Sequence, residues 1–160
     1  MNDHTDIRIG TLAGKGAQTP EYIRQILPHG FESFEVNFWQ TIGDVDLRKL
    51  AQEVRQVLDE NGNRAVVSSV GVYGNPIENK ATARDFGRLI DAARLFGCDL
   101  VCGFSGCLMG KPVPDAMKAF KKTWAPLAKR AADKGVRIAF ENCDMGGTWN
   151  SASYNLAHAP

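Results

Sequence analysis

Hydrophobic and polar residues alternate along the chain in repeated units, each with a short apolar run, a loop and a longer amphipathic stretch. The apolar runs predict five β-strands, and apolar residues spaced three or four apart between them predict four helices. The predicted strands are Ile7–Gly10, Phe34–Phe38, Ala65–Val72, Leu100–Phe104 and Val136–Glu141. The predicted helices are Pro20–His29, Asp44–Asn61, Ala81–Phe96 and Pro114–Lys134.

A glycine follows each predicted helix: Gly30, Gly62, Gly97 and Gly135. Glycine readily takes the left-handed backbone that ends many helices, so these positions predict C-terminal caps. Their regular spacing indicates one βα unit used repeatedly, which is the module of parallel sheets. Because helices cover such sheets, we expect strands that are apolar on both faces.

The fourth predicted helix contains Pro126. Proline removes an amide donor and clashes with the preceding turn, so it predicts a break or kink there. Met117 and Trp124 lie on the apolar stripe of this helix and are expected in the core.

Two architectures fit five βα units. One is an open doubly wound sheet of flavodoxin type, and the other is the first five units of a (β/α)8 barrel. A chain of 160 residues favours the open sheet on length alone, because a complete barrel needs about 250 residues. The first loop, Gly10–Gly16, resembles a phosphate-binding P-loop only loosely.

Composition narrows the functional classes. The net charge of +1 argues against non-specific nucleic-acid binding, and 44% hydrophobic residues suffice for a core. No apolar run approaches the roughly 20 residues that cross a bilayer, and Met1–Asp6 does not resemble a secretory signal. The four cysteines lack the paired spacing of zinc sites. These features predict a cytoplasmic protein with reduced thiols and no membrane partner.

Aromatic and amide residues follow the predicted strands. In either architecture the C-terminal strand ends meet at one face, where α/β proteins bind ligands. Trp39, Tyr73 and Asn75 lie there, among glycines that let a ligand approach the backbone. Hydrogen-bonding groups beside aromatic faces suit a sugar, so these three residues are candidate substrate contacts. The alternative for each is packing or turn formation, which composition alone favours. Phe104 lies at the same face and is expected to pack.

Four segments of the chain together resemble one family. They are residues 138–147 (IAFENCDMGG), 73–76 (YGNP), 97–101 (GCDLV) and 155–160 (NLAHAP). In this order and spacing they are similar to the sugar phosphate isomerase/epimerase family, the xylose isomerase-like TIM barrels. The resemblance covers essentially the whole chain. It implies a partial (β/α)8 barrel, with residues 1–160 forming a single domain truncated before strand six.

The resemblance assigns chemistry to Glu141. In the family, the glutamate that ends strand five ligates a divalent metal, usually manganese, magnesium, cobalt or zinc, and in several members it also moves the proton. Glu141 is therefore the implied metal ligand and catalytic residue of a metal-dependent sugar isomerase or epimerase. A carboxylate suits a hard cation, which would stabilise the enediolate formed next to the sugar carbonyl. The alternative for Glu141 is a structural ion pair.

The family's other metal ligands come from strands six to eight, which the 160 residues do not include. We therefore expect weak metal binding, an incomplete chain and possible self-association through open barrel edges. Two other functions stay open. One is a flavodoxin-like module that binds a small ligand, and the other is a non-catalytic assembly domain. The residue types do not select a particular sugar.

Overall fold

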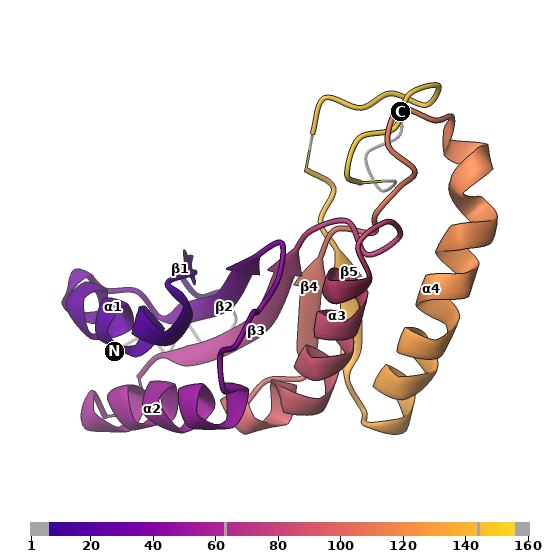
Figure 1. Ribbon diagram of the computed structural model, residues 1–160. Helices are drawn as coiled ribbons and strands as arrows, with labels where there is room; N and C mark the ends of the chain where they lie inside the picture. Colours follow the sequence, from indigo (N-terminus) through magenta and orange to yellow (C-terminus); the bar gives the residue numbers. More distant parts are fainter. Residues whose placement is uncertain (1–6, 63, 144, 156–160) are drawn as a thin grey trace.

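Five parallel strands form one open sheet in the computed structural model, which describes residues 7–62, 64–143 and 145–155 (Figure 1). The strands are β1 (Gly10–Ala13), β2 (Ser33–Trp39), β3 (Val66–Tyr73), β4 (Leu100–Gly103) and β5 (Arg137–Phe140). The α-helices are α1 (Thr19–Ile26), α2 (Leu47–Glu60), α3 (Lys80–Ala92) and α4 (Val113–Asp133). Short 3-10 helices are η1 (Gly16–Gln18), η2 (Leu27–His29) and η3 (Ala93–Phe96).

Each strand pairs with the next strand in the sequence, so the order across the sheet is β1-β2-β3-β4-β5. A flavodoxin-type sheet has the order 2-1-3-4-5, so that alternative is wrong. Sequential parallel strands with a helix after each are the arrangement of a (β/α)8 barrel. The described residues therefore form a partial TIM barrel, as the resemblance implies.

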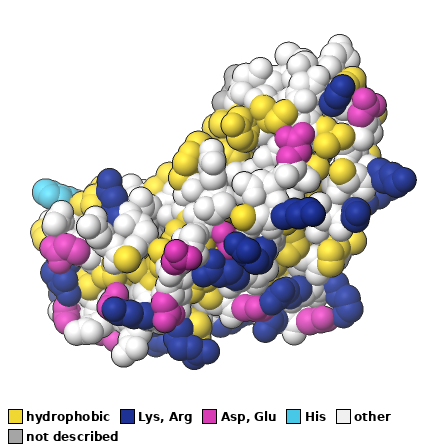
Figure 2. All heavy atoms as spheres, viewed as in Figure 1, with side chains coloured by type: hydrophobic (Ala, Val, Ile, Leu, Met, Phe, Trp, Pro, Cys, Tyr) yellow, Lys and Arg dark blue, Asp and Glu magenta, His cyan; other side chains and the backbone are white. Residues whose placement is uncertain are grey.

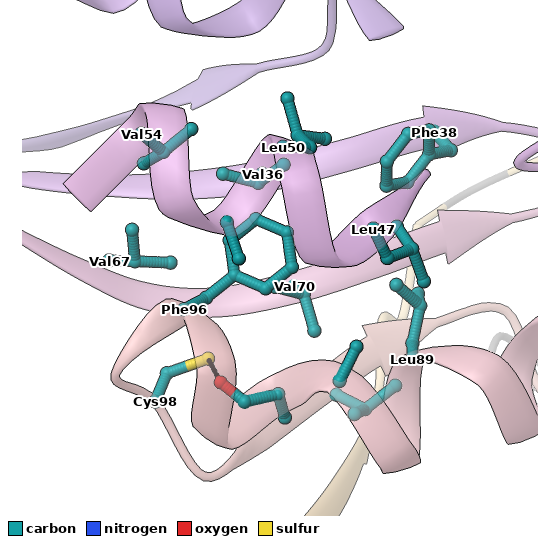
Figure 3. Packing of buried hydrophobic residues seen from close by; sticks show 14 of the residues in the cluster. Val36, Phe38, Leu47, Leu50, Val54, Val67, Val70, Leu89, Phe96 and Cys98 are labelled. Atoms are coloured by element: carbon teal, nitrogen blue, oxygen red, sulfur yellow. Dashed lines mark hydrogen bonds between the residues drawn. The ribbon is translucent and has the colours of Figure 1, made fainter. Parts of the chain in front are cut away.

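Helices α1 to α4 lie side by side along one face of the sheet (Figure 1). Between them and the sheet lies a core of aliphatic and aromatic side chains (Figure 3). Its members in β2, β3, α2 and α3 include Val36, Phe38, Val67, Val70, Leu47, Leu50, Val54 and Leu89. Charged side chains of both signs cover much of the helical surface seen in Figure 2, as the amphipathic pattern predicts.

The opposite face of the sheet, here called the inner face, is not covered by these helices. Phe34, Val36 and Phe38 of β2 are buried against the helices. Glu35, Asn37 and Trp39 alternate with them, so their side chains lie on the inner face. The expectation of strands apolar on both faces is therefore wrong for β2, because the inner face of a barrel is not a helix contact.

The four predicted capping glycines all have left-handed backbones. The φ angles of Gly30, Gly62, Gly97 and Gly135 are 89°, 74°, 86° and 61°. The repeated unit is therefore confirmed, and the observed helices end within a few residues of their predicted ends.

The first strand is three residues later than predicted. Gly10 pairs with Ser33 and Ala13 with Val36, and Ala13 is fully buried. A Cβ atom at Gly10 would lie 2.2 Å from Ser33 Oγ, so the missing side chain permits this pairing. Ile7 and Ile9, which suggested the earlier strand, are 75% and 66% exposed.

The predicted interruption at Pro126 is also wrong, since α4 continues through this residue (Figure 1). Pro126 lies on the exposed side of the helix, where water can solvate the carbonyl that loses its amide partner. Trp124 is buried as expected. Met117 is 40% exposed, so its predicted core position is wrong.

Candidate functional site

Four side chains form a row across the inner face at the C-terminal ends of β2 to β5, here called the mouth row. Trp39 pairs with Tyr73 in the β2–β3 register. Phe104 and Glu141 directly follow Gly103 and Phe140, which pair in the β4–β5 register. The row therefore reads Trp39, Tyr73, Phe104 and Glu141. It brings together three residues that the sequence predicts for the site.

Aromatic contacts hold the first three members of the row together. The rings of Trp39 and Phe104 are 6.4 Å apart and those of Tyr73 and Phe104 are 5.3 Å apart, both edge to face. Phe104 is buried, as expected, whereas the Trp39 indole is 65% exposed. The row thus offers one accessible aromatic surface supported by a packed one.

The Tyr73 hydroxyl does not face the mouth. It donates a hydrogen bond to Glu35, which also accepts one from Ser69 Oγ at 2.7 Å. The ring reaches Glu35 by passing over Gly71, where a Cβ atom would lie 2.9 Å from Tyr73 Cε2. Burial and then the hydrogen bond to Glu35 raise the pKa of Tyr73. Tyr73 is only 8% exposed, so its hydroxyl is used inside the protein and only an edge of its ring borders the mouth.

Glu35, Ser69, Tyr73 and Cys102 form a polar cluster on the inner face. A register shift in the β2–β3 pairing between Phe34 and Glu35 places Ser69 opposite Glu35. Burial, followed by the nearby charge of Glu35, raises the pKa of Cys102 to about 12. At neutral pH this thiol is therefore protonated and a poor nucleophile.

Asn75 connects two of the loops that surround the mouth. Its Oδ1 accepts a hydrogen bond from the Cys107 amide at 3.1 Å, and its Nδ2 donates to the Cys107 carbonyl at 2.9 Å. Asn75 is only 7% exposed. This amide therefore fixes the β3 loop against the β4 loop, which is a contact that the sequence pattern did not suggest.

Glu141 lies at the end of β5 with an exposed side chain. Its amide donates a hydrogen bond to the Gly103 carbonyl at 3.1 Å, which continues the β4–β5 ladder by one residue. The buried Asn155 donates to the Glu141 carbonyl and accepts from Ser105 Oγ at 2.7 Å. The backbone of Glu141 is therefore fixed while its carboxylate stays accessible.

The described residues do not by themselves make a metal site. No group of three or more histidine, cysteine, aspartate or glutamate side chains lies close enough together among them to hold an ion. Glu141 is the one acidic member of the mouth row, and a divalent cation needs several oxygen ligands. Asp144 and residues 156–160 of the family-like segments lie outside the described residues.

Glu35, Ser69 and Cys102 were not among the residues predicted for the site. For Glu35 the available signal was the alternation in residues 33–39 (SFEVNFW), where Ser33, Glu35 and Asn37 alternate with apolar residues. Asn37 belongs to the same set. Its buried Oδ1 has no hydrogen-bond partner among the described residues. The inner face therefore carries more polar groups than the strand ends alone suggest.

Comparisons with known proteins agree with this geometry. A profile of the xylose isomerase-like TIM barrel family matches residues 23–159. The fold is similar to a solved L-ribulose 3-epimerase, with 19% identity and a TM-score of 0.61, over 91% of this chain and 51% of the other. It is also similar to D-allulose 3-epimerase from Methylomonas sp., with 20% identity and a TM-score of 0.59, over 91% of this chain and 54% of the other.

A xylose isomerase domain protein from Planctomyces limnophilus is similar as well, at 15% identity and a TM-score of 0.58, over 83% of this chain and 53% of the other. The chain thus spans about half the length of these solved structures. No significant match was found among curated proteins, and no helix in the described part of the chain could cross a membrane. The family match covers most of the sequence, and the chain belongs to the xylose isomerase-like TIM barrel family.

Proposed function

We propose that this chain carries the first five βα units of a sugar isomerase or epimerase. The mouth row supports the proposal, because in it Glu141 follows a strand next to aromatic residues at the end of the sheet where barrels bind substrates. Solved structures of similar fold are named as epimerases of L-ribulose and D-allulose, and one of them is a complex with D-allulose. These names support a sugar as the small-molecule substrate.

In the proposed reaction, Glu141 removes the proton from the carbon next to the sugar carbonyl. An exposed carboxylate on a fixed backbone suits this transfer, and such general bases accelerate reactions by about 100- to 10,000-fold. Trp39 and the ring of Tyr73 contact the C–H surface of the sugar. Asn75 contributes by holding the loops around it.

Metal dependence belongs to the proposal. Glu141 would be one ligand of a divalent ion (manganese, magnesium, cobalt or zinc), which supplies Lewis-acid stabilisation of the developing negative charge when bound. The described residues complete no ligand set, so no step is assigned to the ion here. We also propose a cytoplasmic location.

Self-association is a second proposal. The outer edges of β1 and β5 have no strand partner among the described residues, and unpaired edges favour association. Sedimentation at several concentrations tests this. A species that grows with concentration supports association, and a single monomeric species at all concentrations contradicts it.

The catalytic proposal is tested by ketose epimerisation with Mn²⁺ or Co²⁺, in the polypeptide extended through the strands that complete the barrel. Glu141→Gln should lower the rate by about 100-fold or more, since it removes the base. Glu53→Gln, on α2 far from the sheet's inner face, is the matched control and should keep the rate. An undiminished rate in Glu141→Gln would refute the assigned role.

A further inference from the structure

A hollow of about 470 Å³ lies between the loops that follow β2, β3 and β4. Its lining includes Gln40, Lys80, Met109 and Tyr154. The volume falls within the range of about 300–1,000 Å³ that is usual for small-molecule sites. The hollow is therefore large enough to be a ligand site in its own right.

Two walls of the hollow are joined to the mouth row. Gln40 directly follows Trp39 in the sequence. On the other side, Tyr154 directly precedes Asn155, whose side chain donates a hydrogen bond to the Glu141 carbonyl. The hollow and the mouth row are therefore linked through Trp39–Gln40 and through Asn155, although no mouth-row residue itself lines the hollow.

The backbone of Gln40 is held in an uncommon conformation, with φ at 61°. Its amide donates to the Tyr73 carbonyl at 2.9 Å, and its carbonyl accepts from Thr82 Oγ1 at 2.8 Å. Only glycine fits at position 74, where a Cβ atom would lie 2.7 Å from the Gln40 oxygen. A left-handed backbone is unfavourable for a residue other than glycine and persists only where its surroundings enforce it.

Helix α3 fixes the rest of the β2–α2 loop. The buried Asp85 accepts a hydrogen bond from the Ile42 amide at 2.8 Å. Arg88 is paired with Asp85 at 3.0 Å and donates to the carbonyls of Gly43 and Val45, both at 2.9 Å. The wall that carries Gln40 is thus formed before any ligand arrives, which lowers the entropy lost on binding.

The chemistry of the lining favours a neutral ligand rich in hydroxyl groups. The Gln40 amide and the Tyr154 phenol can both donate and accept hydrogen bonds, and Lys80 adds three donors. None of these three groups is paired with another described residue. Glu78 also lines the hollow, anchored by the Asn75 amide at 3.2 Å and the Met109 amide at 3.1 Å. Its negative charge disfavours a phosphate.

From this juxtaposition we propose that the hollow binds an uncharged sugar unit attached to the unit that reacts at the mouth row. Gln40, Lys80 and Tyr154 contact its hydroxyl groups, and Trp39, which directly precedes Gln40, contacts the unit at the mouth. The inference rests on the proposed function, because it assumes that a sugar occupies the mouth. It implies a substrate with at least two sugar units rather than a free monosaccharide.

Calorimetric titration of the chain tests this, with D-allulose as a single-unit probe and isomaltulose, glucose joined to fructose, as a two-unit probe. The variants are Gln40→Gly, which suits the left-handed backbone, and Lys80→Met. Each should lower the affinity for isomaltulose relative to D-allulose by about two- to tenfold, as expected for one or two lost hydrogen bonds. Lys118→Met, an exposed lysine of α4, is the control and should leave this ratio unchanged.

An unchanged ratio in both variants would overturn the inference while leaving the mouth proposal intact. Tighter, Lys80-dependent binding of fructose 6-phosphate than of isomaltulose would overturn the uncharged class. Conversely, if Glu141→Gln abolishes epimerisation and Gln40→Gly still lowers the affinity ratio, both proposals are supported. If Gln40→Gly and Lys80→Met leave the affinity ratio unchanged while Glu141→Gln still abolishes epimerisation, this inference fails and the proposed function stands.

Discussion

The two faces of the sheet have opposite chemistry although the same strands build both. The helix-covered face carries Phe34, Val36 and Val70, which are fully buried and apolar. The inner face carries Glu35, Ser69 and Tyr73, which bond to one another. Because successive residues of a strand point to opposite faces, the strands can meet two separate demands. The helix-covered face stabilises the fold, and the inner face carries the polar and aromatic groups of the proposed site.

The largest effect is expected on the helix-covered side. Phe86 of α3 is fully buried, with its ring 4.8 Å from that of Trp124. Phe86→Ala should lower the free energy of unfolding by about 3–5 kcal/mol, measured by denaturant titration. Leu12→Ala is the matched control on the inner side of β1, where the side chain is 57% exposed. Its effect should stay within about 0.5 kcal/mol. Equal losses would contradict the division between the faces.

A smaller effect is expected from crowding the inner face. In Gly71→Ala, the new Cβ atom would lie 2.7 Å from Glu35 Oε1 and 2.9 Å from Tyr73 Cε2. Unfolding free energy should fall by about 1–3 kcal/mol, as for other overpacked sites. The penalty should shrink when Tyr73→Ala removes the ring. If the penalty is the same in both backgrounds, the ring does not cross Gly71 as described.

The smallest effect concerns pH. The pKa of Tyr73 is raised by burial and by its bond to Glu35, above the value of about 10 in an unfolded chain. The contribution of Tyr73 to the free energy of unfolding is therefore complete below pH 10 and is lost as pH rises further. Between pH 8 and 10.5 the loss should be about 0.8 kcal/mol greater in the wild type than in Tyr73→Phe.

Denaturant titrations at the two pH values measure this difference. Cys102, with a pKa of about 12, adds a loss of the same sign in every variant, so it cancels in the comparison. An identical pH dependence in Tyr73→Phe and the wild type would show that the Tyr73–Glu35 bond does not form.

Most of the fold could be predicted because its determinants are local. Gly30 and Gly97 end helical segments through their own backbone freedom. The apolar stripe of α2 directly predicts which of its residues are buried. The position of β1 could not be read locally. Ile7 and Ile9 have strand-like side chains, but the pairing of Gly10 with Ser33 depends on a contact 23 residues away. Pro126 is tolerated for a similar reason, since buried Trp124 and Leu127 hold α4 in place.

The site could be predicted only in part. Trp39, Tyr73 and Glu141 follow from their places at strand ends, and the parallel register brings them into one row. The direction of the Tyr73 hydroxyl depends on Gly71 and Glu35, which belong to two different strands. The role of Asn75 depends on Cys107 in another loop. Such contacts need the tertiary arrangement, so residue type and position do not reveal them.

The most direct test of the account maps ligand contacts by NMR, following backbone amide shifts of the chain as D-allulose is added. The largest changes are expected at Trp39, Tyr73 and Glu141, at the carboxyl ends of the strands. The amide shifts of residues on the outer surfaces of α2 and α4 should not change. Changes confined to those helical surfaces, or absent at the mouth row at saturating sugar, would contradict the claim that the inner face is the binding face.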